Sequence, residues 1–232
     1  MRDPVVDKKG IAVLASGRGS DLQSILDAVS SGLIATGEVR IVVSDRPDAP
    51  ALDRGRRHGA EAVHVAPVAK AEGGRAQNER DVMAAIDAAG GVDLVVLAGY
   101  MRLLSPLFVD AYHDRLINIH PALLPAFKGV DGPGDALRYG VKVAGCTTHF
   151  VDHEMDAGPV ILQGAVLVHP DDDRDALAAR ILALEHQILP RTVDLFLQDR
   201  LTRDGRLVRV ADGDTWHGRV DPVPEALYPY GF

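Results

Sequence analysis

Residues 11–23 read IAVLASGRGSDLQ, an apolar run that leads through a glycine-rich turn into an amphipathic segment. The run at 11–14 has the uninterrupted apolar composition of a strand that is buried on both faces. After the turn, apolar residues recur at spacings of 3, 4 and 7 and form one helical stripe, made of Leu22, Ile25, Leu26 and Val29. A strand, a glycine-rich turn and a helix in direct succession predict an α/β protein.

The alternation of strands and helices continues beyond this unit. Further apolar runs predict strands at residues 39–43, 63–65, 94–98 and 116–119. Two intervening stretches are expected to be helical, at residues 48–59 and about 74–89. Strands that alternate with helices are typical of a parallel sheet with crossover connections, so we expect this arrangement in the first half of the chain.

The pattern changes after residue 120. A long loop rich in proline and glycine comes first, and expected strands follow near 143–151 and 160–168. A long helix is expected from 175 to about 198, and Pro190 should kink or divide it. The predicted fold class is therefore α/β, with a mostly parallel central sheet, helices on both faces and a mixed C-terminal half.

The composition limits the class of protein and its partners. The chain has 232 residues, of which 47% are apolar and 25% charged, as expected for one folded domain. Its formal net charge of −8 disfavours nucleic acid and anionic membranes as partners. The single cysteine excludes an intrachain disulfide, the N-terminus lacks a signal-peptide core, and no apolar run reaches the ~18–20 residues of a spanning helix. We therefore expect a cytoplasmic protein that binds small molecules, with no nucleic acid and no membrane among its partners.

The glycine-rich turn at residues 15–23 has the features of an anion-binding loop. Its glycines let backbone N–H groups point at an anion, and the helix that follows adds about half a positive charge. The turn lacks the ending of a Walker A loop, and Leu22 replaces the third glycine of a dinucleotide fingerprint. Ser20 and Gln23 fit a capping box that would start the helix. We predict binding of a mononucleotide-type phosphate, with a turn that binds no ligand as the alternative.

Asn118 and His120 lie at the end of a predicted strand, where open α/β sheets place their sites. Because side chains alternate along a strand, both point to the same side. Asp156 follows in the turn DAGP, from which a carboxylate can reach the imidazole. A histidine–aspartate pair beside an amide donor suits chemistry at a carbonyl carbon, since the imidazole exchanges protons and the amide stabilises an oxyanion. Taken singly, His120 and Asp156 also fit a structural histidine and a turn former.

Other chemistries have weaker support in the sequence. Cys146 lies inside an apolar strand pattern with no helix N-terminus beside it, which argues against a nucleophile. No G-x-S-x-G motif is present, so a serine hydrolase of that type is not expected. The candidate metal ligands are His149, His153, Glu154 and Asp156. A metal site is disfavoured because His149 belongs to an expected strand, so that His149 and His153 cannot form the i, i+4 pair of ligands that a helix provides.

Four segments together resemble the phosphoribosylglycinamide formyltransferase family. They are SGRGSDLQ (16–23), LAGYMRLL (97–104), NIHPALLP (118–125), and HFV (149–151) with DAGP (156–159). The resemblance covers residues 10–199 in the family's order and spacing. It implies a Rossmann-like formyltransferase fold, with a catalytic domain at 10–199 and a C-terminal extension of unknown role at 200–232. Within this extension, Asp204-Gly205 predicts a hairpin, and the last residues, 222–232, are expected to lie along the surface or to be disordered.

The resemblance also implies a role for each matched residue. The catalytic residues would be Asn118, His120 and Asp156. The ribonucleotide phosphate and ribose would be bound by Gly19, Ser20, Asp21 and Glu185. The formylfolate would be bound by Arg75, Met101, Arg102, Leu103, Leu104 and Asn118, with Thr147 and His149 supporting the site. The formyl donor would be 10-formyltetrahydrofolate; no metal is implied, and the family allows a homodimer.

Two positions depart from the family's usual pattern. Asp21 stands where the family usually has asparagine, and its carboxylate would repel a phosphate unless the side chain points away or Arg18 compensates the charge. Leu182 stands where some members have a polar residue near the phosphate. The segment after residue 200 has no counterpart that the resemblance assigns.

Three other functions stay open at this point. Formyltetrahydrofolate deformylases share the Asn/His/Asp core but resemble this chain only with an additional N-terminal domain. Methionyl-tRNA formyltransferases share the core too, but they carry a C-terminal RNA-binding domain, and a net charge of −8 does not suit tRNA. A nucleotide-binding module without catalysis would need only the glycine-rich turn.

Overall fold

A seven-stranded sheet runs through the computed structural model, which describes residues 8–211 and 226–228. The strand order is β3-β2-β1-β4-β5-β6-β7, in which the first five strands are parallel and β6 and β7 are antiparallel to their neighbours. The strands are β1 (Lys9–Leu14), β2 (Gly37–Ser44), β3 (Glu61–His64), β4 (Leu94–Leu97), β5 (Leu116–His120), β6 (Val143–Phe150) and β7 (Val160–Leu167). The predicted α/β class, with a mostly parallel sheet and a mixed second half, is confirmed.

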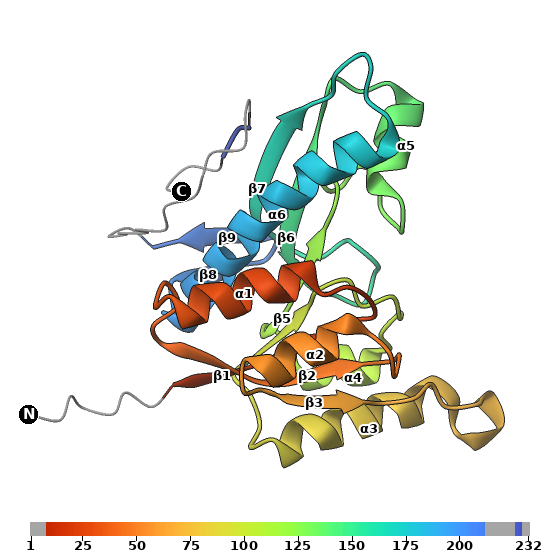
Figure 1. Ribbon diagram of the computed structural model, residues 1–232, viewed down its shortest axis with the longest axis vertical. Helices are drawn as coiled ribbons and strands as arrows, with labels where there is room; N and C mark the ends of the chain where they lie inside the picture. The colour runs from red at the N-terminus through yellow and green to blue at the C-terminus, as the bar shows by residue number, and fades with distance from the viewer. Residues whose placement is uncertain (1–7, 212–225, 229–232) are drawn as a thin grey trace, which may run out of the picture.

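Helices cover both faces of the sheet (Figure 1). They are α1 (Ser20–Ser30), α2 (Pro50–Arg57), α3 (Gly74–Ala88), α4 (Pro106–Ala111), α5 (Gly132–Tyr139) and α6 (Arg174–Leu197), with a short 3₁₀ helix at Lys70–Glu72. Helices α1, α2 and α6 share one apolar core with Ile11 and Val13 of β1. Helices α3 and α4 share a second core with Ala12 and Leu14. Because alternate residues of β1 fill two cores, the strand is apolar at every position from residue 11 to residue 14.

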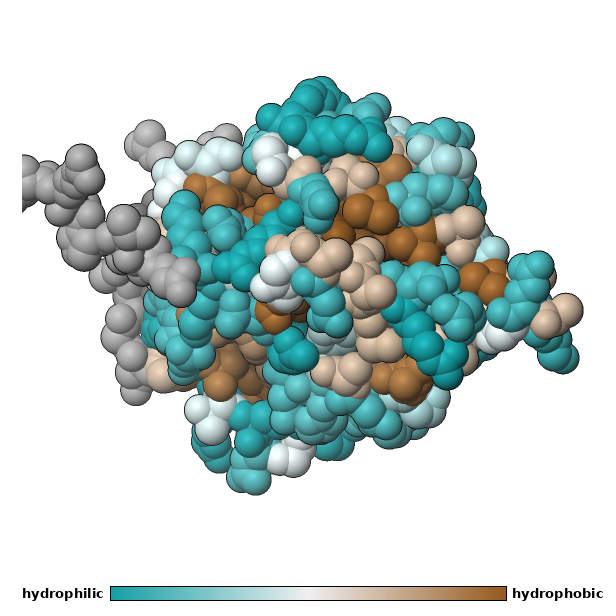
Figure 2. Space-filling view, turned by 90° about the horizontal axis from the view of Figure 1, so that it is seen from below, coloured by the Kyte–Doolittle hydropathy of each residue, from teal (hydrophilic) through white to brown (hydrophobic). Residues whose placement is uncertain are grey.

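The surface on the α3 side is mixed in character. Figure 2 views this end of the molecule and shows separate apolar patches surrounded by hydrophilic residues. Among residues 8–211 and 226–228, no helix combines the length and the apolar character needed to cross a bilayer.

Two local expectations were wrong, and one short helix, α4, was not predicted. The loop after residue 120 contains α5, because short segments that begin with proline or glycine carry too little periodicity to be read as helices, and α4 escaped prediction for the same reason. Pro190 does not divide α6. A proline inside a helix costs about 3 kcal/mol, and the fully buried side chains of Ile188, Leu189 and Val193 around it offset that cost by packing in the first core.

The C-terminal hairpin is confirmed. Strands β8 (Leu201–Asp204) and β9 (Leu207–Val210) form a separate two-stranded sheet that follows α6 directly. Further along the chain, Leu227 exchanges backbone hydrogen bonds with Ala165 and so adds a single bridge to the edge strand β7. Of the expected C-terminal end at 222–232, residues 222–225 and 229–232 lie outside the described part of the chain.

Candidate functional site

A pocket of about 440 Å³ opens at the carboxyl ends of β4 and β5, where parallel sheets commonly bind ligands. Most of the residues singled out in the sequence line it. These are Asp21, Met101, Arg102, Leu103, Leu104, Asn118, His120, His149, Asp156 and Glu185. Four others lie outside its lining: Gly19, Ser20, Arg75 and Thr147. The structure thus joins segments that are separated by more than 160 positions in the chain.

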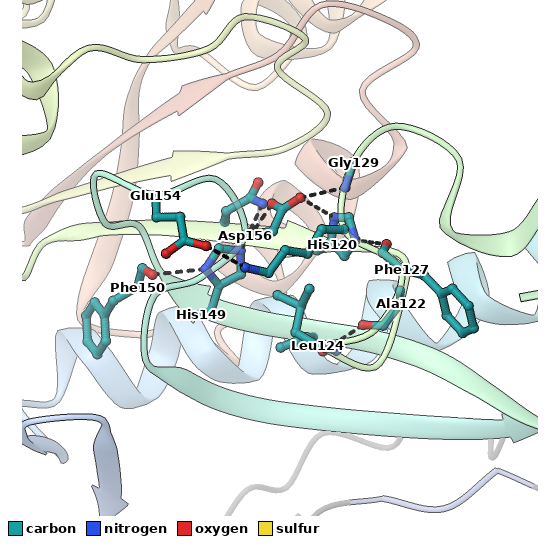
Figure 3. Close-up of polar contacts among 12 residues, drawn as sticks. His120, Ala122, Leu124, Phe127, Gly129, His149, Phe150, Glu154 and Asp156 are labelled. Carbon is teal, nitrogen blue, oxygen red and sulfur yellow. Dashed lines mark hydrogen bonds and ion pairs between the residues drawn. The ribbon is translucent and has the colours of Figure 1, made fainter. Parts of the chain in front are cut away.

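His120 is buried at the end of β5, with both ring nitrogens facing oxygen atoms. Its Nε2 lies 3.0 Å from the carbonyl oxygen of Phe127, and its Nδ1 lies 3.6 Å from Oδ2 of Asp156. The same Asp156 oxygen accepts a hydrogen bond of 2.9 Å from the backbone N–H of Gly129. In Figure 3, Asp156 points toward both His120 and Gly129. The two oxygen atoms therefore fix the orientation of the imidazole at the pocket wall.

His149 orients Asn118 through a chain of hydrogen bonds, of which Figure 3 shows the one from His149 to the Phe150 carbonyl. Burial lowers the pKa of His149, which favours the neutral ring. The neutral ring donates from Nδ1 to the Phe150 carbonyl, at 2.9 Å, and accepts at Nε2 from the Asn118 amide, at 3.1 Å. The amide oxygen and the second amide hydrogen of Asn118 are therefore presented by a fixed side chain at the pocket wall.

The turn that carries Asp156 is closed at its base. The N–H of Phe150 donates to the carbonyl of Pro159 at 2.9 Å. A Cβ on Gly158 would lie 1.7 Å from the Phe150 carbonyl oxygen, so only glycine fits there. Asp156 itself has a φ of 50°, a left-handed conformation that costs a non-glycine residue roughly 1–2 kcal/mol. The surrounding contacts must therefore hold it in place.

Asp21 and Glu185 bring two interacting carboxyl groups to the lining of the pocket. Asp21 lies in the first turn of α1, and its Oδ1 is buried 3.6 Å from Nε2 of His186 on α6. Burial raises the pKa of Asp21 to about 6. Burial and the charge of Asp21 raise the pKa of Glu185 well above its ordinary value. The two groups therefore resist being ionised together.

The glycine-rich turn is held by a residue that the sequence analysis missed. Arg54 of α2 donates from Nε to the Arg18 carbonyl and from Nη1 to Gln23, both at 2.8 Å. Arg18 itself is exposed. The expected capping box is absent: Gly19, with a φ of 69°, is the N-cap, and helix α1 starts at Ser20 without a side-chain cap. Gly19 takes this place because the left-handed backbone is open to glycine, and Arg54 was missed because it is 36 residues from Arg18.

The loop at 101–104 is fastened at both ends. The N–H of Met101 donates to Oγ of Ser16 at 2.9 Å, and the N–H of Ser105 donates to the buried carboxylate of Glu79 at 2.7 Å. The hydroxyl of Ser105 also donates to Glu79. Met101 is 64% exposed and Leu103 59% exposed, so this loop offers apolar surface at the mouth of the pocket.

Thr147 and Arg75, two of the expected residues, do not line the pocket. Thr147 is fully buried in β6 and donates to the Ala122 carbonyl at 2.7 Å while it accepts from the N–H of Leu124 at 3.0 Å. It therefore supports the loop that follows His120. Arg75 lies exposed near the start of α3. Within the described residues, no group of three or more His, Cys, Asp or Glu side chains is arranged to hold a metal ion.

Comparison with known proteins shows that the chain is similar to formyl transferases. A family model described as formyl transferase matches residues 9–193. The phosphoribosylglycinamide formyltransferase of Escherichia coli (strain K12) is 44% identical over 191 residues, which cover 82% of this chain and 88% of that protein.

Solved structures give the same relationship. Glycinamide ribonucleotide transformylase 1 from Symbiobacterium toebii matches with a TM-score of 0.84 and 47% identity, over 89% of this chain and 95% of that one. A formyltetrahydrofolate deformylase from Pseudomonas putida KT2440 matches with a TM-score of 0.78 and 29% identity, over 88% of this chain and 70% of that one. With a family model that spans most of its length and relatives of this similarity, the chain belongs to the formyl transferase family.

Proposed function

We propose that the protein transfers the formyl group of 10-formyltetrahydrofolate to the amine of 5′-phosphoribosylglycinamide, yielding the N-formyl product and tetrahydrofolate in purine biosynthesis. The observation that carries the proposal is the convergence of Asn118, His120 and Asp156 on one pocket. The same pocket is lined by Asp21, Glu185 and the loop at 101–104. The similarity to named phosphoribosylglycinamide formyltransferases supports the choice of both substrates.

The proposed chemistry uses the polar groups of the pocket directly. The substrate amine attacks the formyl carbon, and negative charge develops on the formyl oxygen. Asn118 donates a hydrogen bond to this oxygen and His120 stabilises the same charge, as in other sites that bind an oxyanion. Asp156 faces His120 at 3.6 Å and assists transfer of the proton from the amine to the departing folate nitrogen.

Different parts of the site suit the two substrates. At the start of α1, backbone N–H groups of Gly19, Ser20 and Asp21 would hold the phosphate at the helix N-terminus, with Glu185 on the ribose. In the loop at 101–104, the exposed apolar side chains fit the ring systems of a folate. The residues assigned to the formylfolate are Arg75, Met101, Arg102, Leu103, Leu104 and Asn118, of which Arg75 lies outside the pocket lining.

The remaining expectations are part of the same proposal. Residues 10–199 would form the catalytic unit and 200–232 an extension to it. The reaction would need no metal, would take place in the cytoplasm, and would involve neither nucleic acid nor a membrane. One copy of the pocket is proposed to perform the reaction, and the protein could form a homodimer.

A deformylase is the second candidate, because a solved deformylase shares this fold at 29% identity. One experiment separates the two functions. The protein is incubated with 10-formyltetrahydrofolate, with and without the ribonucleotide, and release of tetrahydrofolate is followed. Release only in the presence of the ribonucleotide supports the transferase. Equal release without it supports the deformylase, and no release under either condition overturns both.

A further inference from the structure

The C-terminal hairpin reaches back to the turn that carries Asp156. Arg206 lies between β8 and β9, and its Nη1 donates a hydrogen bond of 2.8 Å to the carbonyl of Ala157. Ala157 directly follows Asp156, so this contact acts on the peptide next to the carboxylate that faces His120. It joins two segments that are 49 residues apart in sequence.

The hairpin is itself attached to the body of the protein at several points. Arg203 of β8 forms an ion pair with Asp114, in the segment that leads into β5. Its Nε also donates to the Gly205 carbonyl at 3.0 Å, which braces the hairpin turn beside Arg206. Near the base of the hairpin, Asp199 pairs with Lys9 at 2.7 Å. Arg206 is therefore presented from an anchored element.

The turn around Asp156 is supported from three directions. Its base is closed by the hydrogen bond between Phe150 and Pro159. Its inner side is held by the Gly129 N–H, which donates to the Asp156 carboxylate. Arg206 provides the third contact, from outside the turn. Because Asp156 has a left-handed backbone, each support opposes relaxation of the turn toward a commoner conformation.

We propose that Arg206 is a positioning residue for formyl transfer, which holds the Asp156 turn so that its carboxylate stays against His120 and Gly129. The inference rests on the proposed function and gives the start of the C-terminal extension a role in it. Arg206 touches neither substrate in this proposal. Its loss should therefore reduce turnover without weakening the binding of substrates.

The test compares Arg206→Ala with Arg206→Lys and with a matched control, Arg209→Ala. Arg209 lies on β9 of the same hairpin, and its side chain makes no hydrogen bond or ion pair with any residue in 8–211 or 226–228. We expect Arg206→Ala to lower kcat by about 3- to 10-fold, the range set by one hydrogen bond, with each KM changed less than about 2-fold. Arg206→Lys, which keeps a cationic donor group, should recover part of the loss, and Arg209→Ala should match the wild type.

A second readout does not depend on activity. The Gly129 amide proton reports its hydrogen bond to Asp156 directly, so its exchange with solvent, followed by NMR, should be faster in Arg206→Ala and unchanged in Arg209→Ala. This measurement remains informative if the wild type transfers no formyl group, which would refute only the proposed function. Wild-type exchange at Gly129 in Arg206→Ala would overturn the positioning role. An equal loss of turnover in Arg209→Ala would overturn it too.

Discussion

Replacing Asp21 by asparagine should stabilise the protein at neutral pH. The pKa of this carboxyl rises from an ordinary 3.8 to about 6 because the group is buried between α1 and α6. One pKa unit corresponds to about 1.4 kcal/mol, so the ionised carboxylate destabilises the folded state by up to about 3 kcal/mol. Asp21 also interacts favourably with the N-terminus of α1, which stabilises the folded state by about 0.3–1 kcal/mol and reduces this cost. The net gain expected for Asp21→Asn is therefore about 2 kcal/mol at pH 7.5.

The gain should depend on pH in a defined direction. Between pH 3.8 and about 6 the folded protein binds more protons at Asp21 than the unfolded chain does. The stability of the wild type relative to Asp21→Asn therefore falls as the pH rises through this window and stays low above it. Below the window the carboxyl is protonated in both states, and most of the advantage of the asparagine variant should be gone by about pH 4.5.

Urea unfolding at pH 7.5 and pH 4.5 measures both quantities. Asp27→Asn is the matched control, since it removes the same charge from an exposed position on the same helix. Asp21→Asn should also leave the KM for the ribonucleotide nearly unchanged, because the Asp21 carboxylate faces α6 and the proposed phosphate contacts are backbone N–H groups. A stability gain that is equal at the two pH values, or equal in the control, would refute the argument from burial. A large decrease in that KM would show that the carboxylate repels the ligand.

Three further predictions test the site and its surroundings. Asn118→Ala and His120→Ala should each lower steady-state turnover at least 100-fold in folded protein, since the loss of one hydrogen-bond donor to an oxyanion raises the barrier by about 2.7–4 kcal/mol. Near-normal turnover of either variant would contradict the assignment. Gly158→Ala should destabilise the protein by more than about 1 kcal/mol in urea unfolding, because its Cβ would overlap the Phe150 carbonyl; wild-type stability would show that the turn adjusts freely. Cys146 should react with a thiol reagent at pH 8 only after unfolding, because burial and nearby carboxylates raise the pKa of its thiol. Rapid reaction of the native protein would show that the thiol is accessible.

The grouping of the site residues shows how far local patterns reach. Asn118 and His120 were placed on one side of a strand by alternation alone, and both line the pocket. The contacts that hold the catalytic side chains were beyond local inference. The Phe127 carbonyl, which faces His120, and the Gly129 N–H, which binds Asp156, are backbone groups, which every residue carries and no sequence pattern marks. The third contact, with the neutral ring of His149, depends on burial that only the folded sheet creates.

The sequence by itself determined the α/β class, the parallel first half of the sheet, the glycine-rich turn and the placement of Asn118 and His120 on one side of a strand. These follow from periodicity and residue type, which act over a few positions at a time. The other site residues in the pocket were expected from the resemblance to the formyltransferase family. Only the tertiary structure decided how Arg54, Glu79 and Arg206 hold the loops of the site, that Pro190 is accepted inside α6, and that Asp21 faces Glu185. Each of these depends on contacts between distant segments, whose burial and geometry outweigh local preference once the chain has folded.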